Sequence, residues 1–132
     1  MKISYNYSLR NFNTFGIAVK AKEYIRLDSI QEARDFLSGG GAGRGKCLLL
    51  GGGSNILFTG DFDGTVVQPA FNSIEIIKAG PSAVHLSAEA GLKWDSLVEW
   101  AVRNEFGGLE NLSYIPGNVG AAPIQNIGAY GV

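Results

Sequence analysis

The chain has 132 residues, of which 17% are charged, and its formal net charge at pH 7 is -1. A nucleic-acid groove needs clustered Lys and Arg, so a near-neutral chain without a basic block excludes that partner class. No run approaches the roughly 20 apolar residues of a membrane span and no cleavable leader is recognisable, so a cytoplasmic, non-membrane protein is expected. With one cysteine and one histidine, neither a disulfide framework nor a metal site is expected.

A strand and a helix are predicted for the first part of the chain. Residues 22–27 alternate between apolar and polar side chains, which predicts a strand. Ser29 and Glu32 form a capping box, in which each side chain can accept a hydrogen bond from the other residue's backbone N–H. Apolar residues at helical spacing follow, so a helix is predicted as far as about Ser38.

A second strand and a loop come next. The apolar run 46–50, bounded by glycines, predicts a buried strand in which Cys47 is a small buried side chain. Residues 40–47 approach the P-loop pattern, but Cys47 stands where a Mg²⁺-binding hydroxyl is required, and the loop follows a helix instead of a strand. A helix-to-strand connection is therefore the better interpretation. Extended structure is expected again at 56–58.

The second half of the chain predicts three more strands and a longer helix. The strands are expected at 65–68, 73–78 and 83–89, and the turn-forming residues 79–82 join the last two as a hairpin. Residues 92–105 predict a helix ended by a Gly-Gly pair. Its apolar stripe comprises Trp94, Leu97, Val98, Ala101 and Val102. The chain as a whole is predicted to be mixed α and β.

A first candidate site is the segment Gly51-Gly52-Gly53-Ser54-Asn55, which directly follows a predicted strand. Three successive glycines leave the backbone bare, so their N–H groups can converge on an anion. Ser54 and Asn55 add side-chain donors at the same place. This combination suits a pyrophosphate bound without net positive charge, and the alternative on composition alone is a tight glycine turn.

A second candidate site lies in the glycine-rich stretch that follows Tyr114. Pro116 stiffens its start, and glycines remove side chains around it. Val119, Ile124 and Ile127 are expected to form an apolar wall for a flat heteroaromatic ring, whose edge could bond the amides of Gln125 and Asn126. The alternative is a buried loop held by its own amide hydrogen bonds.

Taken in order, these segments resemble one family closely, the UDP-N-acetylenolpyruvoylglucosamine reductases of peptidoglycan synthesis. The matching segments are NTFG at 13–16, GGGSNIL at 51–57, GLENL at 108–112, IPGNVG at 115–120 and PIQNIGAYG at 123–131. The resemblance implies a truncated α+β FAD-binding fold of the vanillyl-alcohol-oxidase (PCMH) type. An incomplete first FAD-binding subdomain would occupy 1–65, and the start of a second would occupy 66–132.

The same resemblance implies a reaction and a set of site residues. In the family, NADPH reduces FAD, which then reduces UDP-N-acetylglucosamine enolpyruvate to UDP-N-acetylmuramate for the cell wall, with its links to cell shape, cell cycle and cell division. Tyr130 would lie near the substrate. The implied FAD-binding residues are Gly51, Gly52, Gly53, Ser54, Asn55, Ile56, Ile115, Pro116, Gly117, Val119, Gly120, Ala121, Ile124, Gln125, Asn126, Ile127 and Gly128.

No catalytic residue is expected within this chain, because the family's proton donor and substrate-binding residues correspond to positions beyond Val132. The chain alone is therefore expected to lack reductase activity, and uncovered apolar surface is expected to favour self-association. Two other readings stay open, a stand-alone flavin-binding domain and another flavoprotein oxidase of the same fold. An oxidase would not be expected to share residues 123–131.

Overall fold

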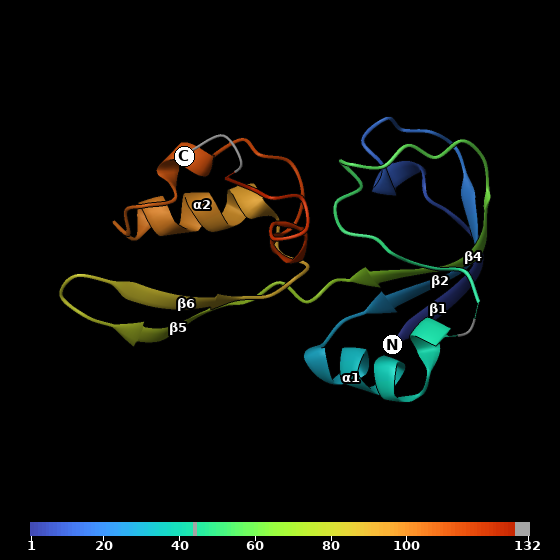
Figure 1. Cartoon of the computed structure of the whole chain (residues 1–132), viewed down its shortest axis with the longest axis horizontal. Helices are drawn as coiled ribbons and strands as arrows, with labels where there is room; N and C mark the ends of the chain where they lie inside the picture. Colours follow the sequence, from blue (N-terminus) through green and yellow to red (C-terminus); the bar gives the residue numbers. More distant parts are fainter. Residues whose placement is uncertain (44, 129–132) are drawn as a thin grey trace. The chain divides into compact units, whose positions relative to one another are not determined.

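The computed structural model describes residues 1–43 and 45–128, and it divides the chain into two compact units (Figure 1). The first unit runs from Met1 to Phe71 and the second begins at Asn72. The subdomain boundary expected after Thr65 would fall inside strand β4 (Phe62–Pro69), which is hydrogen-bonded across most of its length within the first unit's sheet.

The first unit is built on a four-stranded sheet with the order β1-β2-β4-β3. Its other strands are β1 (Lys2–Ser8), β2 (Lys20–Leu27) and β3 (Cys47–Leu49). β1 is antiparallel to β2, whereas β2, β4 and β3 are mutually parallel neighbours. The carboxyl ends of three parallel strands therefore meet at one edge of the sheet, and the triple-glycine segment leaves β3 at that edge.

Helix α1 (Ile30–Ser38) covers one face of this sheet, as its place beneath the strands in Figure 1 indicates. The Ser29 hydroxyl accepts a hydrogen bond from the Glu32 N–H at 3.1 Å, so the predicted helix start is confirmed. The second half of the capping box differs, because the Glu32 carboxylate accepts from the Asp28 N–H at 2.7 Å and not from Ser29.

The opposite face of the sheet is covered by two long connections, and the first of them contains a single turn of 3-10 helix (Arg10–Phe12). Leu9 and Val19 from one loop, and Leu50 and Phe58 from another, are buried against the sheet. Their partners on the strands are Ala21, Tyr24 and Val66. The two loops therefore form the second layer of the first unit, and the candidate pyrophosphate segment belongs to this layer.

The strand predicted at 46–50 forms, but it is an edge strand and is not buried. Cys47 is exposed and Leu49 is 64% exposed, so the prediction of a buried cysteine is wrong. The reason is strand order: β4 lies between β3 and β2, which leaves β3 with one neighbour. No strand forms at 56–58, where extended structure was expected, and those residues belong to the loop layer.

The second unit combines a hairpin with one helix. β5 (Ile74–Ala79) and β6 (Val84–Ala88) pair antiparallel, which confirms the predicted hairpin. Helix α2 (Trp94–Arg103) lies along it (Figure 1). It is shorter than predicted and ends before the Gly-Gly pair. None of the helices in the described residues is long and apolar enough to cross a bilayer.

The apolar stripe of α2 is narrower than predicted. Trp94, Leu97, Val98 and Ala101 are buried, but Val102 is 52% exposed. The Trp94 indole N–H donates to the Leu112 carbonyl at 2.8 Å, so this side chain belongs to the core and also ties the following loop to the helix. The core of the second unit therefore depends on loop residues as well as on the hairpin.

The Tyr24 side chain predicts how the first unit responds to alkaline pH. Its ring stacks on Tyr7 with 4.2 Å between centroids, and burial, followed by the neighbouring Tyr7, raises the pKa of Tyr24 to about 12. The unfolded chain releases this proton near pH 10, so the stability contribution is intact below pH 10 and is lost between pH 10 and 12, by roughly 2 kcal/mol.

Urea unfolding at a series of pH values checks this expectation. Tyr24→Phe should remove most of the decline between pH 10 and 12, because the group that titrates is gone. Tyr5→Phe is the matched control, since Tyr5 is 70% exposed and its removal should leave the decline in place. An unchanged slope in Tyr24→Phe would contradict the assignment.

Candidate functional site

The triple-glycine segment begins where β3 ends. The Leu50 N–H donates to the Val67 carbonyl at 2.8 Å, so the last residue before the glycines is still attached to β4. Gly53 is buried and has a φ of +69°. A Cβ built on Gly53 would lie 2.0 Å from the Phe12 carbonyl oxygen, so only glycine fits this position.

The surface against which Gly53 packs is the loop 9–19, here called the bracing loop. The Leu9 N–H donates to the Val19 carbonyl at 2.8 Å and closes the loop at its base. Inside it, the Asn13 side chain is 6% exposed and donates to the carbonyls of Leu9 at 2.8 Å and Ile17 at 3.1 Å. Its oxygen accepts from the Ile17 N–H at 2.9 Å. Asn13 therefore holds the bracing loop in one shape.

Thr14 joins the bracing loop to the triple-glycine segment. Its backbone N–H donates to the Gly53 carbonyl at 3.1 Å, and its hydroxyl donates to the same oxygen at 3.3 Å. Residues 13–16 match the family's N-terminal signature, but the sequence alone indicates no role for them. No local pattern could have assigned one, because the contact joins residues 39 positions apart.

Within the described part of the chain, the backbone N–H groups of the segment after Leu50 find no acceptor. Among the residues that the structure describes, none from Gly51 to Phe58 donates a backbone hydrogen bond to the protein. Ser54 and Ile56 are half-buried, Gly52 and Asn55 are exposed, and none of the eight residues carries a charge. A run of unpaired N–H groups on bare backbone is the arrangement that binds phosphate-type anions.

The second candidate segment runs beside the turn that precedes α2. The Trp94 N–H donates to the Gly117 carbonyl at 3.0 Å, and the N–H groups of Val119 and Gly120 donate to Leu92 and Ala90 at 2.8 and 3.1 Å. Gly120 packs so closely that an added Cβ would lie 2.7 Å from the Ala90 Cβ. Residues 117–120 are thus fixed by backbone pairing to 90–94.

The apolar wall predicted from Val119, Ile124 and Ile127 is not a single surface. Ile115, Val119 and Ile127 are partly buried and pack against the core of the second unit. Ile124 is 81% exposed. The physical reason is that one helix over a two-stranded hairpin leaves apolar surface, which the side chains of this segment cover. Ile124 is the apolar member of the predicted wall that faces outward.

The amide side chains of this segment also differ from each other. Gln125 is half-buried, and its Nε2 donates to the Pro116 carbonyl at 3.4 Å, which supports the alternative of a loop held by its own amides. Asn126 is exposed, with a φ of +54°. Pro116, Gly120 and Gly128 are exposed, and Gly117 and Ala121 are half-buried. Tyr130 lies outside the described residues.

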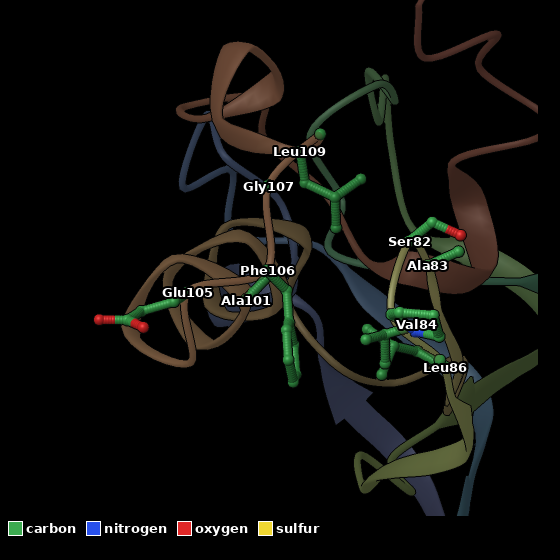
Figure 2. A pocket seen from close by; sticks show the side chains of 12 residues that line it. Ser82, Ala83, Val84, Leu86, Ala101, Glu105, Phe106, Gly107 and Leu109 are labelled. Atoms are coloured by element: carbon green, nitrogen blue, oxygen red, sulfur yellow. The ribbon is translucent and has the colours of Figure 1, made fainter.

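A separate hollow of about 590 Å³ opens in the second unit, between the hairpin turn and the end of α2 (Figure 2). Val84, Leu86, Phe106 and Leu109 contribute apolar side chains, and the Glu105 carboxylate points away from them in Figure 2. No predicted site residue lines this hollow. Among the described residues that line the hollow, Glu105 is the only one with a titratable side chain, so nothing there indicates a catalytic or metal site.

Comparisons with known proteins support the family resemblance. Residues 21–132 match a family model described as an FAD binding domain. The UDP-N-acetylenolpyruvoylglucosamine reductase of Flavobacterium johnsoniae is 47% identical over 131 residues, which cover 99% of this chain and 38% of that protein. The enzyme of that name from Shewanella oneidensis is 47% identical over 130 residues, covering 98% and 38%.

Among solved structures, the chain is similar to a crystal structure of UDP-N-acetylenolpyruvylglucosamine reductase (MurB) from Thermus caldophilus. The TM-score is 0.63 at 23% sequence identity, and the match covers 92% of this chain and 40% of that one. The predicted α+β FAD-binding fold and the predicted resemblance are confirmed. The chain spans well under half the length of these relatives.

Proposed function

Because the chain belongs to the FAD binding domain family, we propose that it holds FAD for the reduction of UDP-N-acetylenolpyruvoylglucosamine. The observation that carries this proposal is the run of unpaired N–H groups after β3, at the carboxyl edge of three parallel strands. The names of the relatives support the reaction. NADPH as reductant, the UDP-sugar substrate, a role in cell-wall synthesis and a cytoplasmic location are parts of the same proposal.

The segment Gly51–Ile56 fits the pyrophosphate of FAD. Its glycines leave room for the anion to approach the backbone, and several N–H dipoles can share the negative charge without a Lys or Arg. Hydrogen bonds from N–H groups to a charged oxygen are about twice as strong as bonds to neutral oxygen. The unpaired donors therefore match a ligand that carries charge.

The second segment fits a flat ring less completely. Ile124 offers an exposed apolar side chain, Asn126 offers an exposed amide, and Gly120 and Gly128 keep the backbone accessible. Ile115, Val119 and Ile127 act mainly by holding this backbone against the second unit's core. We assign the segment to the flavin end of the cofactor, with Gln125 as a brace through Pro116.

FAD, when bound, would supply the redox step, a hydride passed from NADPH to the enolpyruvyl double bond. The residues of this chain position the cofactor. That the proton donor which completes the reduction lies outside this chain remains a prediction. The lack of turnover expected for the chain alone and its self-association remain predictions.

Equilibrium binding of flavins tests the proposal. The chain is titrated with FAD and with riboflavin, and binding is followed by the change in flavin fluorescence. We expect FAD to bind at least about tenfold more tightly than riboflavin, because riboflavin lacks the pyrophosphate that the charge-assisted bonds recognise. ADP should compete with FAD. Equal affinity for both flavins, or no binding of FAD, would overturn the proposal.

A further inference from the structure

The bond pattern around Gly53 assigns a role to Thr14 that goes beyond holding two loops together. We propose that Thr14 is a positioning residue, which fixes the Gly53–Ser54 peptide so that the Ser54 N–H points at the bound pyrophosphate. This inference rests on the proposed FAD site. Its evidence is that both hydrogen-bond donors of Thr14 meet on one carbonyl oxygen, that of Gly53.

The geometry follows from the planarity of the peptide bond. In a trans peptide the C=O and the next N–H lie in one plane and point in opposite directions. The Gly53 carbonyl is held toward Thr14, so the Ser54 N–H must point away from the bracing loop. Ser54 N–H is one of the donors without an acceptor in the described chain. Thr14 therefore sets the direction of one donor of the site.

The rest of the bracing loop makes this orientation rigid. Asn13, beside Thr14, is fixed by three hydrogen bonds, and Gly53 packs directly against the Phe12 and Asn13 backbone. A carbonyl that accepts two hydrogen bonds also polarises its own peptide, which strengthens the N–H on the other side as a donor. Both effects raise the affinity for an anion without a direct contact between Thr14 and the ligand.

A conservative substitution separates positioning from folding. Thr14→Val keeps the shape of the side chain and the backbone N–H, but it removes the hydroxyl donor. The Gly53–Ser54 peptide is then held by the Thr14 backbone N–H alone, so FAD affinity should fall, by up to roughly fivefold, the equivalent of one net hydrogen bond. Riboflavin affinity should not change, because riboflavin has no pyrophosphate. Thr14→Ser, which keeps the hydroxyl, should restore FAD affinity.

The matched control is Thr59→Val, the same change at an exposed threonine just after this segment. It should leave both affinities unchanged. As a second measurement, inorganic pyrophosphate is titrated into isotope-labelled protein, and the Ser54 amide resonance should shift less in Thr14→Val than in the wild type.

The results that overturn the inference differ from those that overturn the proposed site. Unchanged FAD affinity in Thr14→Val, with a wild type that binds FAD, removes the positioning role and leaves the proposed site standing. An equal loss for FAD and riboflavin does the same, because it indicates a structural role alone. A wild type that binds neither FAD nor pyrophosphate overturns the proposed site and this inference together.

Discussion

Gly53→Ala is expected to abolish FAD binding and to destabilise the first unit by about 3 kcal/mol. Two effects act at this position. The φ of +69° strains any residue with a Cβ, and the new methyl group would lie 2.0 Å from the Phe12 carbonyl oxygen. Because that oxygen is backbone, the clash is relieved only if the triple-glycine segment moves away from the bracing loop. The Thr14 bonds to the Gly53 carbonyl are then lost as well.

The measurement combines flavin titration with hydrogen exchange of the β2 and β4 amides, which reports the opening of the first unit. Gly60→Ala is the matched control, since a Cβ there meets no atom within 4 Å. It should change stability by less than about 0.5 kcal/mol and leave FAD affinity intact. A Gly53→Ala variant that binds FAD normally would disprove the close packing of these loops.

Gly120→Val is expected to destabilise the second unit by about 3 kcal/mol and to leave the exchange of β2 and β4 unchanged. The first added carbon alone would lie 2.7 Å from the Ala90 Cβ. The backbone at Gly120 would have to move away from the backbone at Ala90, which breaks the hydrogen bond from the Gly120 N–H to the Ala90 carbonyl. The core side chains Val119 and Ala122 would lose their anchoring.

Tryptophan fluorescence during urea unfolding measures this effect, because both tryptophans of the chain, Trp94 and Trp100, lie in the second unit. Gly107→Ala is the control, since its Cβ would meet only the Glu110 side chain, at 3.8 Å. A double-mutant cycle that combines Gly120→Val with Ala90→Gly should give a coupling free energy of at least about 1 kcal/mol, because Ala90→Gly removes the atom closest to the added side chain. Additive effects would contradict the described packing of these two positions.

The sequence was most informative where structure depends on neighbouring residues. The Ser29 cap, the hairpin of β5 and β6 and most of the apolar stripe of α2 are local patterns, and they were predicted correctly apart from Val102 and a one-residue shift of the hairpin turn. Strand order is not local. β4 lies between β2 and β3, so β3 is an edge strand, and Cys47 is exposed on a strand whose sequence indicates burial. Non-local packing also placed Val119 and Ile127 against the core of the second unit but left Ile124 exposed.

The candidate site also combines features that depend on local sequence with features that depend on distant contacts. Glycines and small polar residues after an apolar run predicted unpaired backbone donors at 51–55, and this depends on composition. The orientation of those donors depends on Thr14 and Asn13, which lie far earlier in the chain. Such contacts leave no periodicity or spacing in the sequence, so only the structure could supply them.

The loop layer of the first unit links affinity to folding. Leu9, Val19, Leu50 and Phe58 bury one face of the sheet, and the same two loops carry the anion donors and their brace. A ligand that binds only the ordered layer stabilises the folded state by mass action, in proportion to the logarithm of its concentration over Kd. In this unit the apolar core and the proposed ligand site share the same two loops, so bound FAD would raise the free energy of unfolding of the first unit.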